Sequence, residues 1–268
     1  MNRKKCAIKA IQLMLALALF VVAAQRTFAY TEEEEQEASA GADASNPTAA
    51  VNYQDLRYRY FDLKSGAEKH SFETDGSYVF HPRFKVTNEL RGVSTNRGGD
   101  WENSLEELAF KGIFLTDGRP LGIKAKYALG LEWKKDLGDF REGTGSGADI
   151  IAPLAGIGWV PTDMDFIITL IQYFHSYSTH DGGSDVRSTG PRLIYIRKIP
   201  QIGGWFKADF KGVFDHEDDD DFSSTLEFQL GKMFTPRIGL YGEGFIGDEV
   251  FDTNAYDWGL GLGLRFMY

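Results

Sequence analysis

Charged residues occupy every second position in several stretches of the chain. Within 204–215, for example, Lys207, Asp209 and Lys211 alternate with apolar residues. Successive side chains of a β-strand point to opposite sides, so this spacing puts the charges on one face. Such a face can pass ions or polar solutes, or it can pair its charges internally. The candidates for a charged lining are Arg57, Arg59, Arg83, Lys85, Arg91, Lys124, Lys126, Lys207, Asp209, Lys211, Glu227, Glu243 and Arg265.

Serine and histidine residues lie close together at 175–180, and such residues could hydrolyse a lipid ester. A serine nucleophile needs its histidine base on the same side of the strand. His175 and Ser176 are adjacent, so their side chains point to opposite faces. Ser178 and His180 have the required spacing but lie where a strand should already have become a loop. Polar residues at the end of a strand explain the group better, and we assign no catalytic residue.

A run of carboxylates at 215–221 could collect divalent cations. It lacks the alternating ligands and the glycine of a structured calcium loop. We therefore expect a solvated acidic loop, which could bridge to lipopolysaccharide phosphates through divalent cations. The only cysteine, Cys6, lies in a basic N-terminal segment, so thiol chemistry is not expected in the mature chain. These patterns predict no metal site and no cofactor.

The clearest of the strands that must position these residues lies at 256–268. Leu260, Leu262 and Leu264 share one face with aromatic residues at both ends, while Asp257, Arg265 and three glycines share the other. An apolar band between aromatic girdles is typical of a transmembrane β-strand of about 9–11 residues. The stretch from Tyr256 to Tyr268 also resembles the C-terminal signal of outer-membrane barrels. We therefore expect the barrel-assembly machinery to bind it.

Twelve such stretches can be delimited, and their connections fall into two classes. Short proline-containing turns alternate with longer polar loops, which is the layout of an outer-membrane barrel. The sequence therefore predicts an all-β, antiparallel transmembrane barrel with twelve strands, or ten as the main alternative. A soluble β-sandwich would also alternate, but without aromatic bands at the strand ends. The expected strands are 53–63, 71–80, 83–94, 104–116, 121–135, 149–160, 165–178, 189–199, 204–215, 224–234, 237–246 and 256–268.

The chain before the first strand has two parts. Four basic residues precede an apolar run at 10–24, which predicts a secretory signal peptide over 1–29. Residues 30–51 are acidic and low in complexity, which predicts a disordered periplasmic tail before a barrel at 52–268. Removing five cations with the signal changes the net charge from −10 to −15, which argues against nucleic acid as a partner. No later segment has the roughly 20 apolar residues of a membrane helix.

Several short motifs in the second half of the chain resemble one family of outer-membrane proteins. The motifs are Q-Y-F-H-S-Y-S at 172–178, G-G-S-D-V-R at 182–187, P-R-L-I-Y at 191–195, G-G-W-F-K-A-D-F at 203–210, L-G-K-M-F at 230–234 and D-W-G-L-G-L-G-L-R-F at 257–266. They resemble the family labelled as the putative MetA pathway of phenol degradation. The resemblance implies a transporter-like or porin-like barrel, associated by name with aromatic compounds.

These observations together predict a passive outer-membrane channel for small solutes, which are anionic or aromatic. The expected location is the outer membrane of a Gram-negative bacterium after Sec-type export, in contact with membrane lipids and lipopolysaccharide. Cations outnumber carboxylates on the polar faces, so we expect weak anion selectivity. Gly259, Gly261 and Gly263 are expected to leave part of the wall free of side chains. The alternatives are a lipid hydrolase and a non-conducting structural barrel.

Overall fold

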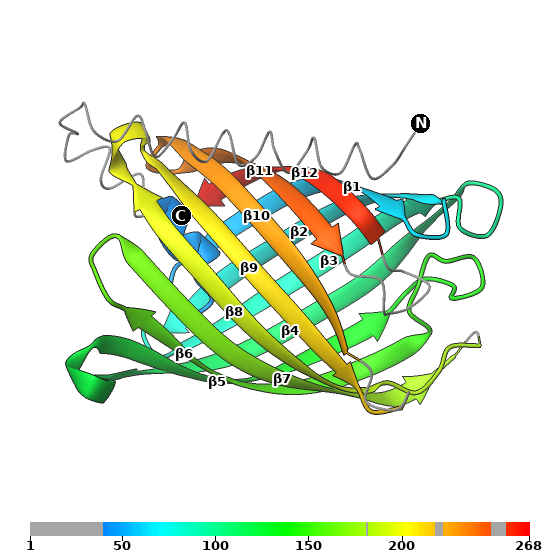
Figure 1. Cartoon of the computed structure of the whole chain (residues 1–268), viewed down its shortest axis with the longest axis horizontal. Coiled ribbons are helices and arrows are strands. Elements are labelled where there is room, and N and C mark those ends of the chain that lie inside the picture. The colour runs from blue at the N-terminus through cyan, green and yellow to red at the C-terminus, as the bar shows by residue number, and fades with distance from the viewer. Residues whose placement is uncertain (1–39, 181, 218–221, 248–255) are drawn as a thin grey trace.

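The computed structural model describes residues 40–180, 182–217, 222–247 and 256–268. They form a closed barrel of twelve antiparallel strands in which each strand pairs with its neighbours in sequence and β12 pairs with β1 (Figure 1). The strands are β1 (Tyr53–Leu63), β2 (Glu68–His81), β3 (Phe84–Thr95), β4 (Glu102–Gly118), β5 (Lys124–Asp136), β6 (Ala148–Val160), β7 (Asp165–Thr179), β8 (Arg187–Ile199), β9 (Gly204–Asp215), β10 (Phe222–Thr235), β11 (Ile238–Gly247) and β12 (Tyr256–Met267).

Closure depends on the pairing of β1 with β12, which runs from Tyr53 opposite Met267 to Tyr60 opposite Leu260 without a break. A closed sheet has no edge, so the backbone polar groups of every strand find partners inside the sheet, as a hydrocarbon surrounding requires. The predicted transmembrane barrel of twelve strands is therefore confirmed. The expected first strand coincides with β1, and most other expected strands are within a few residues of the observed ones.

The connections at the two ends of the barrel differ in length. The short ones are 82–83, 119–123 with a 3₁₀ turn η1 (Pro120–Gly122), 161–164, 200–203 with η2 (Pro200–Ile202), and 236–237. Both ends of the described chain lie at this end of the barrel, while Gly145 and Gly183 belong to the connections at the opposite end (Figure 1). Asp219, which was expected with them, lies outside the described residues. The structure thus separates the turns and loops as the sequence predicts.

The outer surface of the barrel is apolar, because alternate strand residues project their side chains away from the lumen. Leu262 in the middle of β12 is 60% exposed, and Phe72, Phe114 and Leu129 on other strands are exposed to a similar degree. Exposure of this kind in a water-soluble protein would be costly, whereas lipid chains solvate it. None of the described helices is long and apolar enough to cross a membrane.

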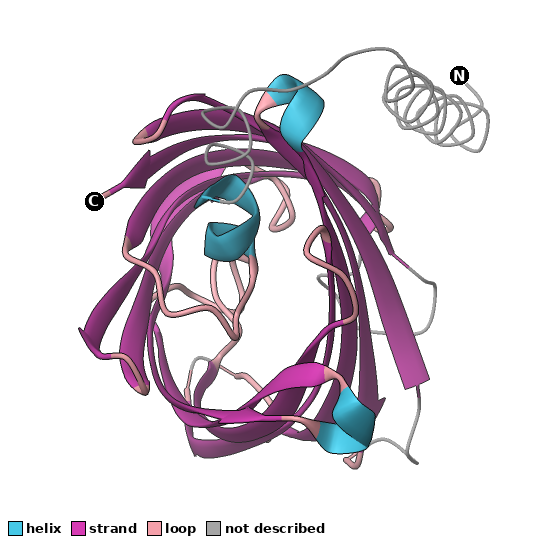
Figure 2. Ribbon diagram, turned by 90° about the vertical axis from the view of Figure 1, so that its left-hand side faces the viewer, coloured by secondary structure: helices cyan, strands magenta, loops and turns pink. Residues whose placement is uncertain are grey.

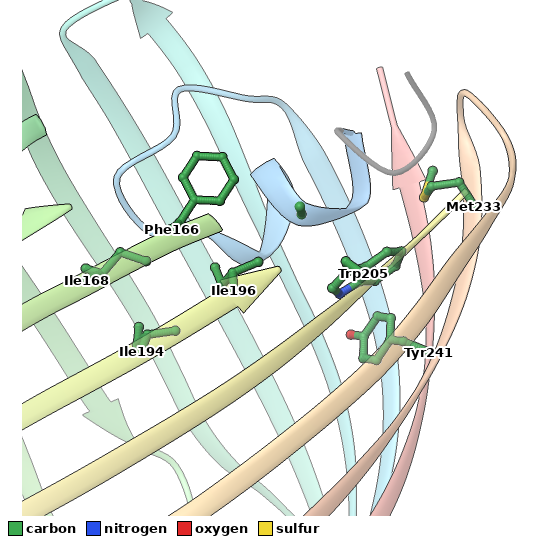
Figure 3. Packing of buried hydrophobic residues seen from close by; sticks show 8 residues of the cluster. Phe166, Ile168, Ile194, Ile196, Trp205, Met233 and Tyr241 are labelled. Carbon is green, nitrogen blue, oxygen red and sulfur yellow. The ribbon is translucent and has the colours of Figure 1, made fainter. Parts of the chain in front are cut away.

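The lumen is not empty, because the chain before β1 folds back into it. Residues 40–45 form a short helix inside the barrel near the end that carries the short turns (Figure 2). Ala42 is fully buried in a cluster with Trp205, Met233 and Tyr241 of the wall (Figure 3). A side chain at Gly41 would collide with the Trp205 ring, since its Cβ would lie 2.1 Å away.

A disordered tail was expected over 30–51, and its described part, residues 40–51, instead includes this internal helix. A segment of small residues cannot form a core of its own. It needs none here, because the barrel wall supplies the apolar partners and small side chains let the helix approach the wall closely. Residues 1–39 lie outside the described residues, so the signal peptide over 1–29 stays a prediction.

Candidate channel lumen

Two cavities of about 200 Å³ or more lie among the described residues inside the barrel. The larger has a volume of about 260 Å³ and is bounded on one side by Ala44, Ser45, Asn46 and Pro47 of the internal segment. The smaller has about 200 Å³ and reaches Leu63 and Tyr256, beside the loops of the opposite end. Both cavities are lined by the same four charged residues, Arg59, Arg91, Lys211 and Glu227. This group, which we call the charged constriction, therefore lies where the two cavities adjoin.

Most of the predicted lining residues are in the lumen. Those that line the larger cavity are Arg57, Arg59, Lys85, Arg91, Lys207, Lys211, Glu227 and Arg265. Asp209 and Glu243 are buried behind them and accept hydrogen bonds from lining cations. Lys126 lies near the internal helix, where its charge acts on Asp43, and Lys124 is exposed at the start of β5.

Arg83 is a correction to this set. It does not lie in the lumen but is exposed in the turn between β2 and β3, because β3 begins at Phe84, one residue later than expected. Lys124 is similarly displaced toward the rim, since the 3₁₀ turn η1 takes up the first residues of the strand expected at 121–135. The side chains of Arg83 and Lys124 are therefore exposed to solvent at the ends of their strands and do not line the lumen.

A single carboxylate, Glu73 of β2, organises the cations beside the constriction. Its oxygens lie 3.2 Å from Arg57 Nη2, 3.0 Å from Arg59 Nη1 and 3.1 Å from Arg91 Nε. Arg59 also donates from Nε to Glu243 at 2.8 Å. Arg57 also pairs with Asp75, and Arg91 pairs with Glu89 and Glu106, so several carboxylates balance the three guanidinium groups at this level of the lumen.

The sequence interpretation did not include Glu73 among the candidates. The signal was present in the alternation of Lys69, Ser71, Glu73 and Asp75, all of which have the same parity in β2. The expected strand began at 71 rather than Glu68, which shortened that alternation. Arg192 of β8 was also missed, and it pairs with Asp209 through Nε at 2.7 Å.

The lysines of β9 are paired across strands. Lys207 Nζ lies 3.2 Å from Asp209 and 2.7 Å from Glu227 Oε1 on β10, and Lys211 Nζ lies 3.0 Å from Glu227 Oε2. The sequence analysis expected weak anion selectivity from unpaired lysines, with internal pairing of the charges as the alternative, and the structure shows these two lysines paired. The register, which sets Glu227 opposite Asp209, makes the cross-strand pairs possible. Buried ions need such partners to offset their loss of hydration.

Arg265 of β12 connects the wall to the internal segment. It forms a bidentate pair with Asp55 of β1, through Nε at 2.9 Å and Nη2 at 2.6 Å, and Tyr241 donates to the same carboxylate at 2.8 Å. Its Nη1 donates to the Gly41 carbonyl and to Ser45 Oγ, both at 2.8 Å. Ser45 Oγ in turn donates to Gln229 at 2.8 Å. The helix is therefore held by polar contacts as well as by apolar packing.

The glycines of β12 do not widen the path, which corrects the expectation for them. A Cβ at Gly263 would lie 2.1 Å from the Tyr241 ring, and one at Gly261 would lie 3.1 Å from both Arg59 Cγ and Glu243 Oε2. Large side chains of the neighbouring strands fill the space beside these glycines.

Ionisable groups that line the larger cavity are mainly cationic, with nine Lys or Arg residues against five Asp or Glu residues. In the internal helix, burial raises the pKa of the Asp43 carboxyl above its ordinary value of 3.8. The positive charges of Lys198 and Lys126 partly oppose that rise. A cationic lining of this kind attracts anions more strongly in a narrow lumen than it would on an open surface.

His175 and Ser176 lie on opposite faces of β7, as their adjacent positions predict. Ser176 is buried, and its Oγ accepts a hydrogen bond from Val186 N at 2.9 Å. His175 lies on the opposite, exposed face and stacks on Tyr173. No group of three or more potential ligands that could hold a metal ion occurs among the described residues. The acidic run at 215–221 lies mostly outside them.

Fold and lumen together define a porin-like outer-membrane β-barrel. No family model matches the sequence, and no curated protein matches it significantly. The resemblance to the MetA-labelled family therefore stays a prediction.

The similar solved structures have the same class of fold. The NanC porin has a TM-score of 0.58 at 11% identity, covering 81% of this chain and 99% of its own. An outer membrane channel from Pseudomonas putida F1 has a TM-score of 0.59 at 12% identity, covering 82% and 96%. The KdgM porin has a TM-score of 0.53 at 8% identity, covering 81% and 99%.

Proposed function

We propose that this barrel is an outer-membrane channel for passive passage of small solutes, with a preference for anions. The observation that carries the proposal is the larger cavity of the lumen, whose charged lining is mainly cationic although the whole chain has a net charge of −10. Similar folds occur in proteins named as porins and channels. One of the KdgM structures is a complex with oligogalacturonate, an acidic sugar chain, which agrees with an anionic solute.

The environment follows from the same features. The apolar outer face fits lipid, so we place the protein in the outer membrane of a Gram-negative bacterium after Sec-type export. Membrane lipids and lipopolysaccharide are the proposed surroundings, and the barrel-assembly machinery is the proposed partner of the C-terminal strand. The second proposed class of solute is aromatic, as the resemblance to the MetA-labelled family implies. An aromatic carboxylate would belong to both classes, because it has a negative charge and an aromatic ring.

The geometry suggests how a solute would pass. An anion entering the smaller cavity meets Arg59, Arg91 and Lys211 at the charged constriction, each of which already has a carboxylate partner. A solute carboxylate can exchange with those partners, so that no cation is left unpaired during passage. The paired charges keep the path narrow, which restricts it to small solutes.

Reversal potentials in a potassium chloride gradient test the proposal. Purified protein in planar bilayers should conduct with a modest preference for chloride. Replacing Lys207 and Lys211 by Gln removes the partners of Glu227 and should shift selectivity toward potassium. Arg83→Gln in the exposed turn is the matched control and should change selectivity little.

A non-conducting structural barrel is the competing function. The internal segment and the extensive ion pairing favour it, because both reduce open space in the lumen. Absence of any conductance from correctly folded protein would establish this alternative. Clear potassium selectivity in the unmodified protein would instead refute the anion preference.

A further inference from the structure

Lys85 of β3 stands apart from the other cations of the lumen. Its side chain is among the largest fully buried ones, since the residue is only 2% exposed. Its Nζ donates to the backbone carbonyl of Ala49 at 2.7 Å. None of the ion pairs formed by the described residues includes Lys85. A buried ammonium group without a counter-charge is unfavourable, so this position would gain from an anion.

The neighbouring strands increase the positive field at Lys85. Lys111 of β4 lines the same cavity, and its Nζ is paired with Glu132 at 3.0 Å. Lys126 of β5 forms no ion pair with a described residue, and its charge also acts on Lys85. Of these three lysines on adjacent strands, only Lys111 has a carboxylate within ion-pair distance. Lys85 and Lys111 lie on the wall of a cavity of about 260 Å³, which is large enough for a small molecule.

In this structure, the hydrogen-bond acceptor for Lys85 comes from the internal segment before β1. Asn46 and Pro47 line the cavity, and Asn46 Oδ1 accepts hydrogen bonds from Thr48 N and Thr48 Oγ1, which shapes the turn that leads to Ala49. The Ala49 carbonyl is a neutral acceptor. A carboxylate on the same ammonium would form a charge-assisted hydrogen bond, roughly twice as strong, and would supply the missing negative charge.

We propose that Lys85 is a binding site for the carboxylate of a small solute, and that residues 46–50 are a displaceable plug that holds this site when no solute is present. Binding of a carboxylate to Lys85 and release of the Ala49 carbonyl are then two parts of one exchange. The helix at 40–45 stays in place during the exchange, because Arg265 and Trp205 hold it independently. The site rests on the proposed channel function, since the solute must reach it through the lumen.

Binding measurements with two sugars test the site. D-galacturonate and D-galactose differ only in the carboxylate, and calorimetry on the full mature chain in detergent should show binding of galacturonate at least tenfold tighter. Lys85→Met should abolish that tenfold preference, Lys85→Arg should retain it, and Lys124→Met at the exposed rim should leave it unchanged. Equal binding of both sugars to the unmodified protein, or an unaltered preference in Lys85→Met, would overturn the site.

A reversible cross-link tests the plug. A Cβ at Gly158 of β6 would lie 3.1 Å from Thr48 Cβ, close to the roughly 3.5–4.5 Å of a disulfide, and the mature chain has no other cysteine. The double variant Thr48→Cys with Gly158→Cys should lose galacturonate binding when oxidised and regain it when reduced. Single-cysteine variants should not respond to oxidation. Equal binding in the oxidised and reduced double variant would show that 46–50 does not cover the site.

Conductance separates this proposal from the channel function. A protein that conducts potassium chloride but does not prefer galacturonate would refute the Lys85 site and leave the channel intact. A protein that binds galacturonate through Lys85 but never conducts would refute the channel and leave the site intact.

Discussion

Replacing Leu262 by arginine is the most direct test of how β12 faces the membrane. Leu262 lies at the centre of the strand with 60% of its surface exposed, so the new charge would enter lipid rather than the lumen. Arginine on the lipid face of a barrel costs about 2–4 kcal/mol at the bilayer midplane and about 0–1 kcal/mol near the interfaces. We therefore expect Leu262→Arg to lower the free energy of unfolding by about 2–4 kcal/mol.

Ile238→Arg provides the matched control. Ile238 also faces outward, but it pairs with Phe266, four residues beyond Leu262 in β12. Four residues span about 13 Å along a strand, or about 10 Å along the membrane normal at a tilt of about 40°. Half of an apolar band about 25 Å tall is about 12 Å, so this arginine lies near the interface and should cost only about 0–1 kcal/mol.

The measurement is reversible urea unfolding of each variant in lipid vesicles, followed by tryptophan fluorescence. The difference between the two variants matters more than either value, because both add the same side chain. Equal destabilisation by Leu262→Arg and Ile238→Arg would refute the placement of Leu262 near the bilayer midplane and of Ile238 near the interface. A small cost at Leu262 alone would show that this face does not meet lipid.

Three further predictions concern topology, packing and pH. Epitope tags inserted at Gly145 should be accessible on intact cells, while tags at Pro200 should not, and labelling of the Pro200 tag would reverse the orientation. Gly263→Ala should destabilise the barrel by about 1–3 kcal/mol, because its Cβ would meet the Tyr241 ring at 2.1 Å. Gly242→Ala, with no atom closer than 4.0 Å, should be tolerated in the same unfolding assay, and equal costs would contradict the packing. Docking of the internal helix should weaken as the pH rises from about 3.8 through the raised pKa of Asp43, because ionising a buried carboxyl is unfavourable. The conductance should therefore be lower at pH 4 than at pH 7, and Asp43→Asn should reduce that difference; an unchanged difference would exclude Asp43 as its cause.

Strand faces follow from the sequence alone, whereas the choice between twelve strands and ten needed the structure. Two-residue alternation is a local property, so each strand shows which of its faces is apolar whatever its neighbours are. The residues from 256 to 268 illustrate this, because Leu262 is exposed and Arg265 is buried as their parity predicts. Turn residues are local too, which is why the short and long connections could be separated before the barrel was known.

The pairing of charges and the content of the lumen depend on the tertiary structure. Whether Lys211 is paired is decided by Glu227 on the neighbouring strand, and only the register brings the two together. The glycine at 263 suggests open space in the sequence, but a tyrosine from β11 fills that space. Residues 40–50 have no core of their own, and their order comes from surfaces that exist only after the barrel has closed around them. Local sequence pattern therefore determines which residues face lipid and which face the lumen. Long-range contacts determine how the lumen charges pair and where residues 40–50 lie.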